Sequence, residues 1–288
     1  MNYLTSNVIQ TYHDLINKRT KKIANIFGII AIPSLLIPIT LFFIYGFSDQ
    51  LIFVISLIFA SNFVGCGIVY IILRRMFISE KPLYTYLYPK VLEKIQYNEK
   101  HDIKYEAYPK IKELIRESLL FTKFASNTTR CGIYYHSDHG NSISIYDTYY
   151  YTQSNNSTVV HFNGYYIMIN GIQVEPIQIR TKGRPTRTQI HYTRTINEKG
   201  LKVFCDKPSA KTNDYIMDIF NKINDKLNPK HLFINTMNQK MYIAVDVHKP
   251  KRKIKTLDQQ SYDELKNHLI HLTNTISDVL FIEGNKNV

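Results

Sequence analysis

Residues 23–73 read IANIFGII AIPSLLIPIT LFFIYGFSDQ LIFVISLIFA SNFVGCGIVY IIL. The stretch contains two apolar runs, 23–48 and 50–73, and Asp49 is the only formally charged residue in it. A helix rises about 1.5 Å per residue, so about 20 apolar residues cross a hydrocarbon core of about 30 Å. Both runs reach that length, and the connector between them is short and polar. We therefore predict a transmembrane helical hairpin over residues 23–75.

Two other interpretations of the apolar stretch fit less well. A cleaved signal peptide has a shorter apolar region and a small-residue cleavage site, whereas here a second apolar run follows at once. A pair of buried core helices would show a polar stripe on each helix, and neither run has one. The membrane interpretation is therefore preferred.

The flanking charges predict the orientation of the hairpin. Cytoplasmic flanks of membrane helices carry an excess of Lys and Arg, and the loop between the two runs contains no basic residue. This predicts a multi-pass protein of the cell inner (plasma) membrane with both termini in the cytoplasm. The basic residues just outside the two runs are Lys18, Arg19, Lys21, Lys22, Arg74 and Arg75.

The chain carries 36 Lys and Arg against 23 Asp and Glu, a net charge of +13. In a soluble protein this excess would suggest a nucleic-acid partner, but no pattern of interleaved aromatic and basic residues supports that. Beside a membrane, the excess indicates attraction to anionic lipid or the usual positive bias of cytoplasmic segments. The three cysteines lack CxxC spacing, so they predict neither a disulfide framework nor a zinc site.

We divide the chain into a basic cytoplasmic leader (1–22), the transmembrane hairpin (23–75), a helical connector (76–124) and a cytoplasmic α+β domain (125–288). Apolar residues recur at spacings of three and four in the connector, which predicts helix. Two arrangements stay open, because periodicity does not distinguish them: the connector holds the domain away from the membrane, or it packs on the domain as core helix.

The last segment predicts a largely antiparallel sheet packed by helices, the α+β fold class. Asn163-Gly164 indicates a two-residue hairpin turn, and Pro176 places the strand 173–180 at an outer edge of the sheet. A final helix over 261–281 has Ser261 and Glu264 spaced as a capping box. Its narrow apolar seam fits either a coiled coil or packing on the sheet, and we prefer the sheet. The strands are expected at 130–135, 142–153, 158–162, 165–170, 173–180, 201–204, 231–236 and 240–247, with a further helix at 213–227.

No residue set identifies a reaction or a cofactor. His136, Asp138 and His139 lie close together and are common metal ligands, but they fall in a turn and no further ligand is identifiable. They are weak candidates, so we predict no metal site. The motifs of P-loop, dinucleotide-binding and serine-hydrolase sites are absent. We predict no catalytic residue, and an enzyme acting at the membrane surface stays an alternative.

Two basic segments are the strongest candidates for binding. Each basic group near an anionic membrane adds about 1 kcal/mol of attraction, although a solvated loop would look the same in sequence. The candidate residues for contact with lipid headgroups are Arg180, Lys182, Arg184, Arg187, Arg194, Lys249, Lys251, Arg252, Lys253 and Lys255.

Three segments resemble a bacterial family catalogued as domain-of-unknown-function family 3137. They are 117–121 (ESLLF), 162–169 (FNGYYIMI) and 202–206 (KVFCD). The resemblance implies a basic leader, a transmembrane hairpin and a cytoplasmic α+β domain, and it implies no activity. The family usually has a longer acidic or polar stretch where this chain has the basic segment 180–211.

From these observations we expect a membrane-anchored binding or scaffold module without catalysis of its own. An anionic-lipid headgroup sensor that uses the basic loops is the second hypothesis. The expected partners are the membrane, through two spans, and a protein of unknown identity, with anionic lipid and a homo-oligomer as further alternatives. A nucleic-acid partner is not favoured.

Overall fold

The computed structural model describes residues 2–45, 50–77, 82–99, 102–121, 126–136, 141–154, 157–172, 175–181, 194–198, 201–205, 210–247 and 257–280. The chain forms two compact units. One contains residues 1–87 and 252–262, and the other contains residues 88–251 and 263–288.

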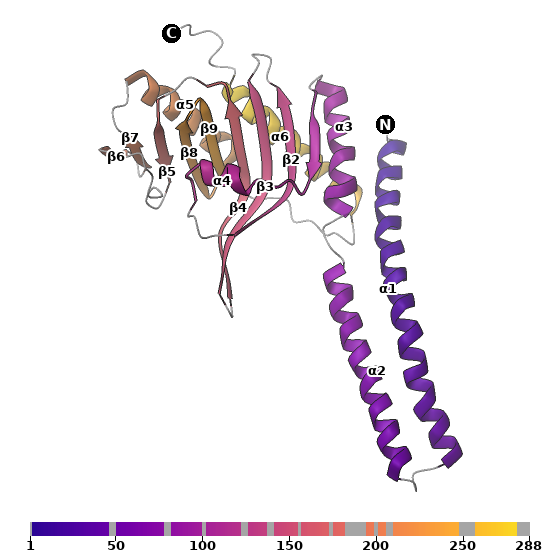
Figure 1. The fold of residues 1–288 in the computed structure, drawn as a ribbon. Coiled ribbons are helices and arrows are strands. Elements are labelled where there is room, and N and C mark those ends of the chain that lie inside the picture. Colours follow the sequence, from indigo (N-terminus) through magenta and orange to yellow (C-terminus); the bar gives the residue numbers. More distant parts are fainter. Residues whose placement is uncertain are drawn as a thin grey trace. The chain divides into compact units, whose positions relative to one another are not determined.

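Two long helices, α1 (Asn2–Tyr45) and α2 (Gln50–Phe77), pack against each other in the first unit (Figure 1). Phe27 of α1 and Tyr70 of α2 meet edge to face, with their ring centroids 5.7 Å apart. The first helix continues without a break from the predicted leader into the first apolar run. The leader and this run are therefore one helix.

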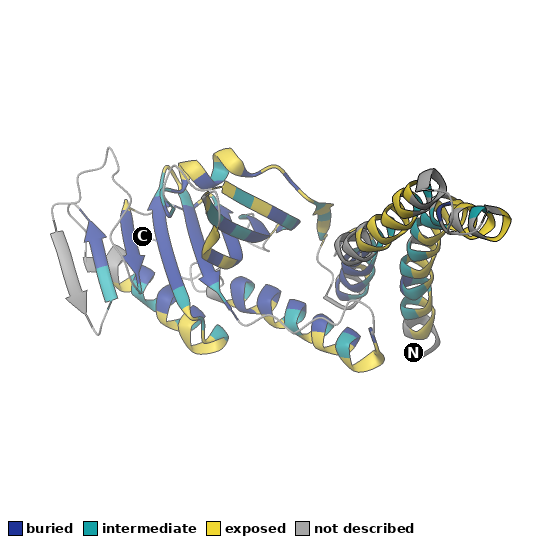
Figure 2. Cartoon of the chain, turned by 90° about the horizontal axis from the view of Figure 1, so that it is seen from below, coloured by how far each residue is buried: buried dark blue, intermediate teal, exposed yellow. Residues whose placement is uncertain are grey.

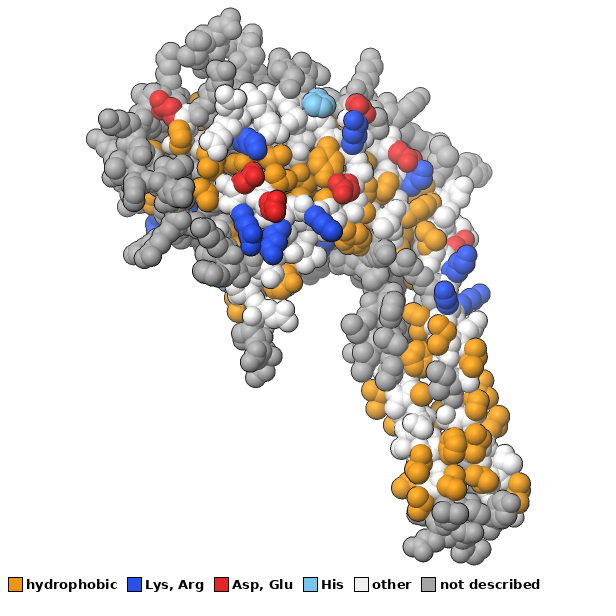
Figure 3. Space-filling model, viewed as in Figure 1, with side chains coloured by type: hydrophobic (Ala, Val, Ile, Leu, Met, Phe, Trp, Pro, Cys, Tyr) orange, Lys and Arg blue, Asp and Glu red, His pale blue; other side chains and the backbone are white. Residues whose placement is uncertain are grey.

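Within the described residues, one helix is long and apolar enough to cross a membrane, over Ser6–Leu41 of α1. The apolar segment of α2, Leu57–Ile68, is shorter. The structure thus contains one candidate membrane span, and the predicted two-span hairpin is not confirmed. Hydrophobic side chains cover much of the visible described surface of this helical pair (Figure 3). The large exposed ones include Ile26, Ile29, Ile32, Leu36, Ile39 and Phe43 on α1, and Val54, Leu57, Ile58, Phe63, Val64 and Ile68 on α2.

The first unit also has a small core near the N-terminal part of α1. The short π-helix η1 (Leu83–Leu87) contacts α1, and its Leu83, Tyr84 and Leu87 are buried. Tyr12 of α1 is fully buried, and His13 Nε2 lies 2.9 Å from the carbonyl oxygen of Leu257. Contacts of Tyr12 and His13, which precede the apolar run, thus hold the N-terminal part of α1.

The second unit contains a nine-stranded sheet with the order β1-β2-β3-β4-β9-β8-β5-β7-β6. All of its strand pairs are antiparallel, which confirms the predicted pairing and the α+β class. The strands are β1 (Lys104–Ala107), β2 (Ser126–His136), β3 (Ser142–Ser154), β4 (Ser157–Asn170), β5 (Ile177–Arg180), β6 (Arg194–Glu198), β7 (Leu201–Cys205), β8 (His231–Met237) and β9 (Lys240–Asp246). The helices are α3 (Tyr88–Glu99), α4 (Lys112–Glu117), α5 (Ala210–Leu227) and α6 (Gln259–Leu280).

Helices cover both faces of the sheet (Figures 1 and 2). Side chains alternate between the faces of a strand. Accordingly, Tyr165 meets His268 of α6, while Tyr166 donates a hydrogen bond to the Leu114 carbonyl oxygen of α4. The helices α5 and α6 lie side by side on one face, joined by the ion pair between Lys226 and Asp278 at 2.6 Å. Most of the central strands and the inner sides of these helices are buried in Figure 2.

The predicted turn at Asn163-Gly164 is wrong, because β4 continues through it from Ser157 to Asn170. Glycine is needed here for close approach rather than for a turn. A Cβ atom on Gly164 would clash with the Val245 carbonyl oxygen and lie 2.9 Å from the Cα atom of Asp246. The glycine therefore marks the place where β9 meets β4.

The predicted outer position of the strand 173–180 is also wrong. The strand β5 begins at Ile177, just after Pro176, and lies between β8 and β7 with both of its edges paired. A proline that precedes a strand removes no hydrogen bond from it. The proline therefore did not exclude a central position.

The predicted helical connector over 76–124 is interrupted by β1, which pairs with β2. The second part of the connector, α4, packs on the sheet as a core helix, with Ile115 buried.

In α6, the Asp258 carboxylate accepts the Ser261 N–H at 2.8 Å, so Asp258 caps this helix rather than Ser261. The apolar seam of α6 packs on the sheet, as preferred; Leu265, Leu269, Leu272 and Ile276 are buried.

Candidate functional site

The β3–β4 hairpin extends beyond the rest of the sheet (Figure 1). The two strands pair from Ser142↔Asn170 to Ser154↔Ser157, but β9 pairs with β4 only from Tyr165 to Asn170. We call the outer part of the hairpin, from Thr148 to Gly164, the arm. Among the described strands, none pairs with the edge of β4 from Ser157 to Asn163. The arm is therefore the most prominent projection of the sheet unit.

Two bulges interrupt the pairing where the arm leaves the sheet. The register between β2 and β3 shifts between Thr129 and Cys131, which leaves Arg130 as an extra residue on β2. The register between β3 and β4 shifts between Tyr150 and Tyr151, which leaves His161 as an extra residue on β4. Bulges bend a strand and redirect its side chains. These two bulges therefore shape the base of the arm.

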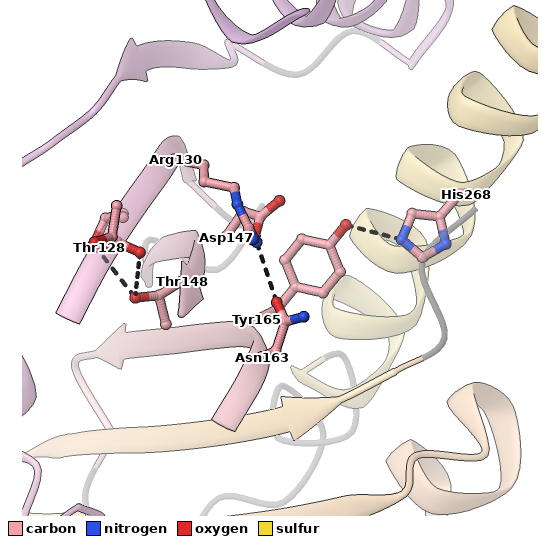
Figure 4. Close-up of polar contacts among 8 residues, drawn as sticks. Thr128, Arg130, Asp147, Thr148, Asn163, Tyr165 and His268 are labelled. Atoms are coloured by element: carbon pink, nitrogen blue, oxygen red, sulfur yellow. Dashed lines mark hydrogen bonds and ion pairs between the residues drawn. The ribbon is translucent and has the colours of Figure 1, made fainter. Parts of the chain in front are cut away.

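The side chain of Arg130 connects three strands at this base (Figure 4). Its Nη1 atom donates to Asp147 Oδ1 on β3 at 3.0 Å and to Asn163 Oδ1 on β4 at 3.1 Å. Its guanidinium carbon also lies 5.8 Å from the ring centroid of Tyr149. The Asp147 side chain is fully buried, whereas 22 % of the Arg130 side chain is exposed. A buried carboxylate is stable only when it is paired, so this contact fixes the three strands relative to each other.

A second polar contact attaches the same region to α6 (Figure 4). The hydroxyl oxygen of Tyr165 and Nε2 of His268 are 2.9 Å apart, and the imidazole tautomer decides which of them donates. The two rings are tilted at a centroid distance of 5.7 Å. On β3, Thr148 donates weakly to the Thr128 carbonyl oxygen at 3.4 Å. These contacts place a carboxylate, a guanidinium, a phenol and an imidazole near each other, and each of them serves to hold neighbouring elements together.

The surface of the arm has no formal charge and includes two exposed valines. Val159 and Val160 are 52 % and 49 % exposed, a large fraction for two adjacent valines. No Asp, Glu, Lys or Arg occurs between Thr148 and Gly164. Thr152 and His161, the bulge residue, make a hydrogen bond across the two strands at 2.8 Å. The visible described face of the arm shows hydrophobic and uncharged side chains, whereas charged side chains of both signs lie over the sheet (Figure 3).

A row of tyrosines crosses four strands on the α4 face of the sheet. Tyr134, Tyr146, Tyr166 and Tyr242 follow one another with ring centroids 5.7, 6.1 and 6.3 Å apart. Burial raises the pKa of each of these phenols, and for Tyr242 the value reaches about 12. They are therefore neutral donors, as in the 3.0 Å hydrogen bond from Tyr134 to Glu106.

Arg180, a predicted headgroup residue, lies on the α4 face and is only 9 % exposed. Its Nη2 atom donates to the Leu120 carbonyl oxygen at 3.2 Å, and its guanidinium carbon lies 4.7 Å from the ring centroid of Phe233. Nearby, Asn235 Nδ2 donates to the Ser118 carbonyl oxygen at 2.7 Å. Arg180 thus helps to hold the chain that follows α4.

The other predicted site residues are not brought together by the described structure. Arg194 lies on β6, and His136 is exposed at the end of β2. In the described part of the chain, no group of three or more His, Cys, Asp or Glu residues could hold a metal ion. The lipid-headgroup role of the basic segments stays a prediction. The remaining candidates lie outside the described residues: Asp138, His139, Lys182, Arg184, Arg187, Lys249, Lys251, Arg252, Lys253 and Lys255.

The Arg130–Asp147–Asn163 cluster was not predicted from the sequence. One signal was present in the sequence, because Asp138 and Asp147 are the only formally charged residues between Arg130 and Glu175. Asp138 falls in the predicted turn, whereas Asp147 falls inside an apolar strand. A carboxylate in such a strand needs a cationic partner, and the preceding strand contains Arg130.

The fold and site define an α+β protein with a candidate membrane helix and a projecting two-stranded arm. No family model and no curated protein matches the chain. Among solved structures, the chain is similar to the crystal structure of the mycobacterial trehalose monomycolate transport factor A, TtfA, with 10% sequence identity and a TM-score of 0.35. The match covers 62% of this chain and 86% of that chain. A likeness at this level carries no argument about fold or function, and membership of domain-of-unknown-function family 3137 stays a prediction.

Proposed function

We propose that the protein is a membrane-anchored, non-catalytic binding module whose sheet unit faces the cytoplasm and whose arm contacts the partner. Support for the anchor comes from α1, which is apolar over a membrane-spanning length and exposes its large apolar side chains. Support for the orientation comes from Lys18, Lys21 and Lys22, which are exposed on the N-terminal side of the apolar run. A second span through α2 would return the chain to the cytoplasm.

The observation that carries the binding role is the arm. Natural proteins cover or charge the edges of their strands, because an exposed edge pairs with other chains. Among the strands that the structure describes, none pairs with the uncharged outer edge of β4, and two half-exposed valines lie next to each other on it. The Arg130 contacts stiffen its base, so little conformational entropy is lost when a partner binds. A stiff projection with an open strand edge fits recognition by strand addition.

The test is site-specific photo-crosslinking of the full-length chain in its native membrane. A photoreactive amino acid replaces Val159 on the arm, and the matched control replaces Glu113, an exposed residue of α4. We expect light-dependent protein adducts from position 159 and at least several-fold fewer from position 113. Equal adduct yields at both positions would show that the arm is not the contact surface. Recovery of the unmodified chain alone from both would refute a binding role.

A further inference from the structure

We infer that the free edge of β4, Ser157–Asn163, pairs with the same edge of a second copy of this chain. The inference rests on the proposed function and deepens it, because it names the partner of the arm.

The first step concerns the backbone of β4. A strand edge exposes a row of N–H and C=O groups that another strand can satisfy. The strand β3 satisfies one side of β4 along its whole length, but β9 satisfies the other side only from Tyr165 onward. The residues Ser157–His161 are exposed. One further strand placed against Ser157–Asn163 would complete the pairing of β4.

The second step compares this edge with the two outer strands of the sheet. The outer strand β1 carries Lys104 and Glu106, and the outer strand β6 carries Arg194 and Glu198. Charged residues on an edge strand hinder pairing with another sheet. The free segment of β4 reads Ser-Thr-Val-Val-His-Phe-Asn, with no formal charge and no proline. The free segment of β4 therefore lacks the charged residues that both outer strands carry.

The third step identifies a second copy as the occupant. The chain carries a net charge of +13, so two copies repel each other over most of their surfaces. The arm lacks charged residues from Thr148 to Gly164, so this repulsion is smallest where two arms meet. Antiparallel pairing of a strand with itself has two-fold symmetry, the commonest symmetry of oligomers. Centred on the segment Ser157–Asn163, it places Val160 of one copy opposite Val160 of the other.

The membrane anchor favours the same partner. Copies held in one membrane are confined to two dimensions, so a second arm is present at a high effective concentration. A peptide of unrelated sequence would make the same backbone hydrogen bonds. It would not supply the contact between two Val160 side chains that self-pairing makes.

The arrangement predicts distances that an experiment can separate. Neighbouring strands lie about 4.8 Å apart, so the Val160 residues of two copies would face each other across the seam between the β4 strands. Gln153 of β3 is exposed and pairs with Thr158 across the arm. The two Gln153 residues would lie at least three strand spacings apart, more than about 14 Å. A short bismaleimide can join the first pair and not the second.

The experiment uses the full-length chain in lipid vesicles with Cys66 replaced by alanine, because the other two cysteines are buried. We expect Val160→Cys to give cross-linked dimers and Gln153→Cys to give roughly tenfold fewer, because the strands of the second pair are too far apart. In a separate series without cysteines at these positions, Val160→Lys should lower the dimer fraction roughly threefold or more, because two lysines would face each other. The control Val160→Thr keeps a β-branched side chain and should leave the dimer fraction within about twofold of wild type.

Equal cross-linking at both cysteine positions, or none at position 160 in vesicles, overturns the self-pairing. The two proposals fail in distinguishable ways. If the photo-crosslinker at position 159 captures only foreign proteins, the binding role stands and the second copy is wrong. If lipid instead shields the thiol of the Val160→Cys variant from a water-soluble maleimide, the arm lies in the membrane surface and self-pairing is wrong.

Discussion

Replacing Gly164 with alanine should destabilise the sheet unit, because this glycine lies where β9 joins β4. The new Cβ atom would meet the Val245 carbonyl oxygen, the Asp246 Cα atom at 2.9 Å and Phe162 Cζ at 2.8 Å. The first two atoms belong to the backbone of β9, so they cannot rotate away as a side chain can. The two strands must separate locally, next to the register pair Tyr165↔Val245.

The magnitude follows from three contributions to the free energy of unfolding. Overpacking in a closed site costs about 1–3 kcal/mol. Loss of one or two backbone hydrogen bonds costs about 1 kcal/mol each. Alanine restricts the unfolded chain, which offsets about 0.4–1 kcal/mol. The net loss is about 3 kcal/mol, and in a unit of this size it lowers Tm by about 6–12 °C.

The assay is thermal unfolding of the full-length chain in detergent, followed by near-ultraviolet circular dichroism. The sequence contains 22 Tyr and no Trp, so this signal reports the packing of the tyrosines. The control is Gly65→Ala in α2, where a Cβ atom meets nothing within 4 Å. A Gly164→Ala variant that melts within about 2 °C of wild type, below the expected shift, would refute the close-approach explanation.

Two further predictions concern the tyrosines and the anchor. Burial, followed by the nearby charge of Glu117, raises the pKa of Tyr242 to about 12 from an ordinary value near 10. The stability gained from keeping the Tyr242 phenol protonated is therefore complete below pH 10 and is lost as the pH rises toward 12. Tyr242→Phe should make the fall of Tm between pH 10 and 12 shallower. An unchanged slope of Tm against pH would contradict this. Leu36→Lys places a charge on an exposed position of the apolar helix at a cost of about 3 kcal/mol in a bilayer. The fraction of protein that stays in the membrane after carbonate extraction should therefore fall, whereas Leu36→Ala should retain it. Equal retention of both variants would contradict a span through α1.

Local patterns were sufficient to predict most elements of the sheet unit. The strands β2, β3, β8 and β9 and the helix α5 follow from alternation and helical spacing, because these patterns depend on neighbours along the chain. Two of the errors arose where a residue type has two uses. Glycine at position 164 permits close approach instead of a turn, and Pro176 precedes a strand instead of marking an outer edge.

The sequence by itself determined an apolar helix of membrane-spanning length, an antiparallel α+β unit and a basic chain, because these properties depend on composition and short-range periodicity. Only the tertiary structure decided that Arg130, Asp147 and Asn163 meet, that Arg180 is buried, and that β4 extends beyond its pairing with β9. Each of these depends on which strands are neighbours and where their pairing stops. That choice is made by packing between residues far apart in the chain, which no local pattern records.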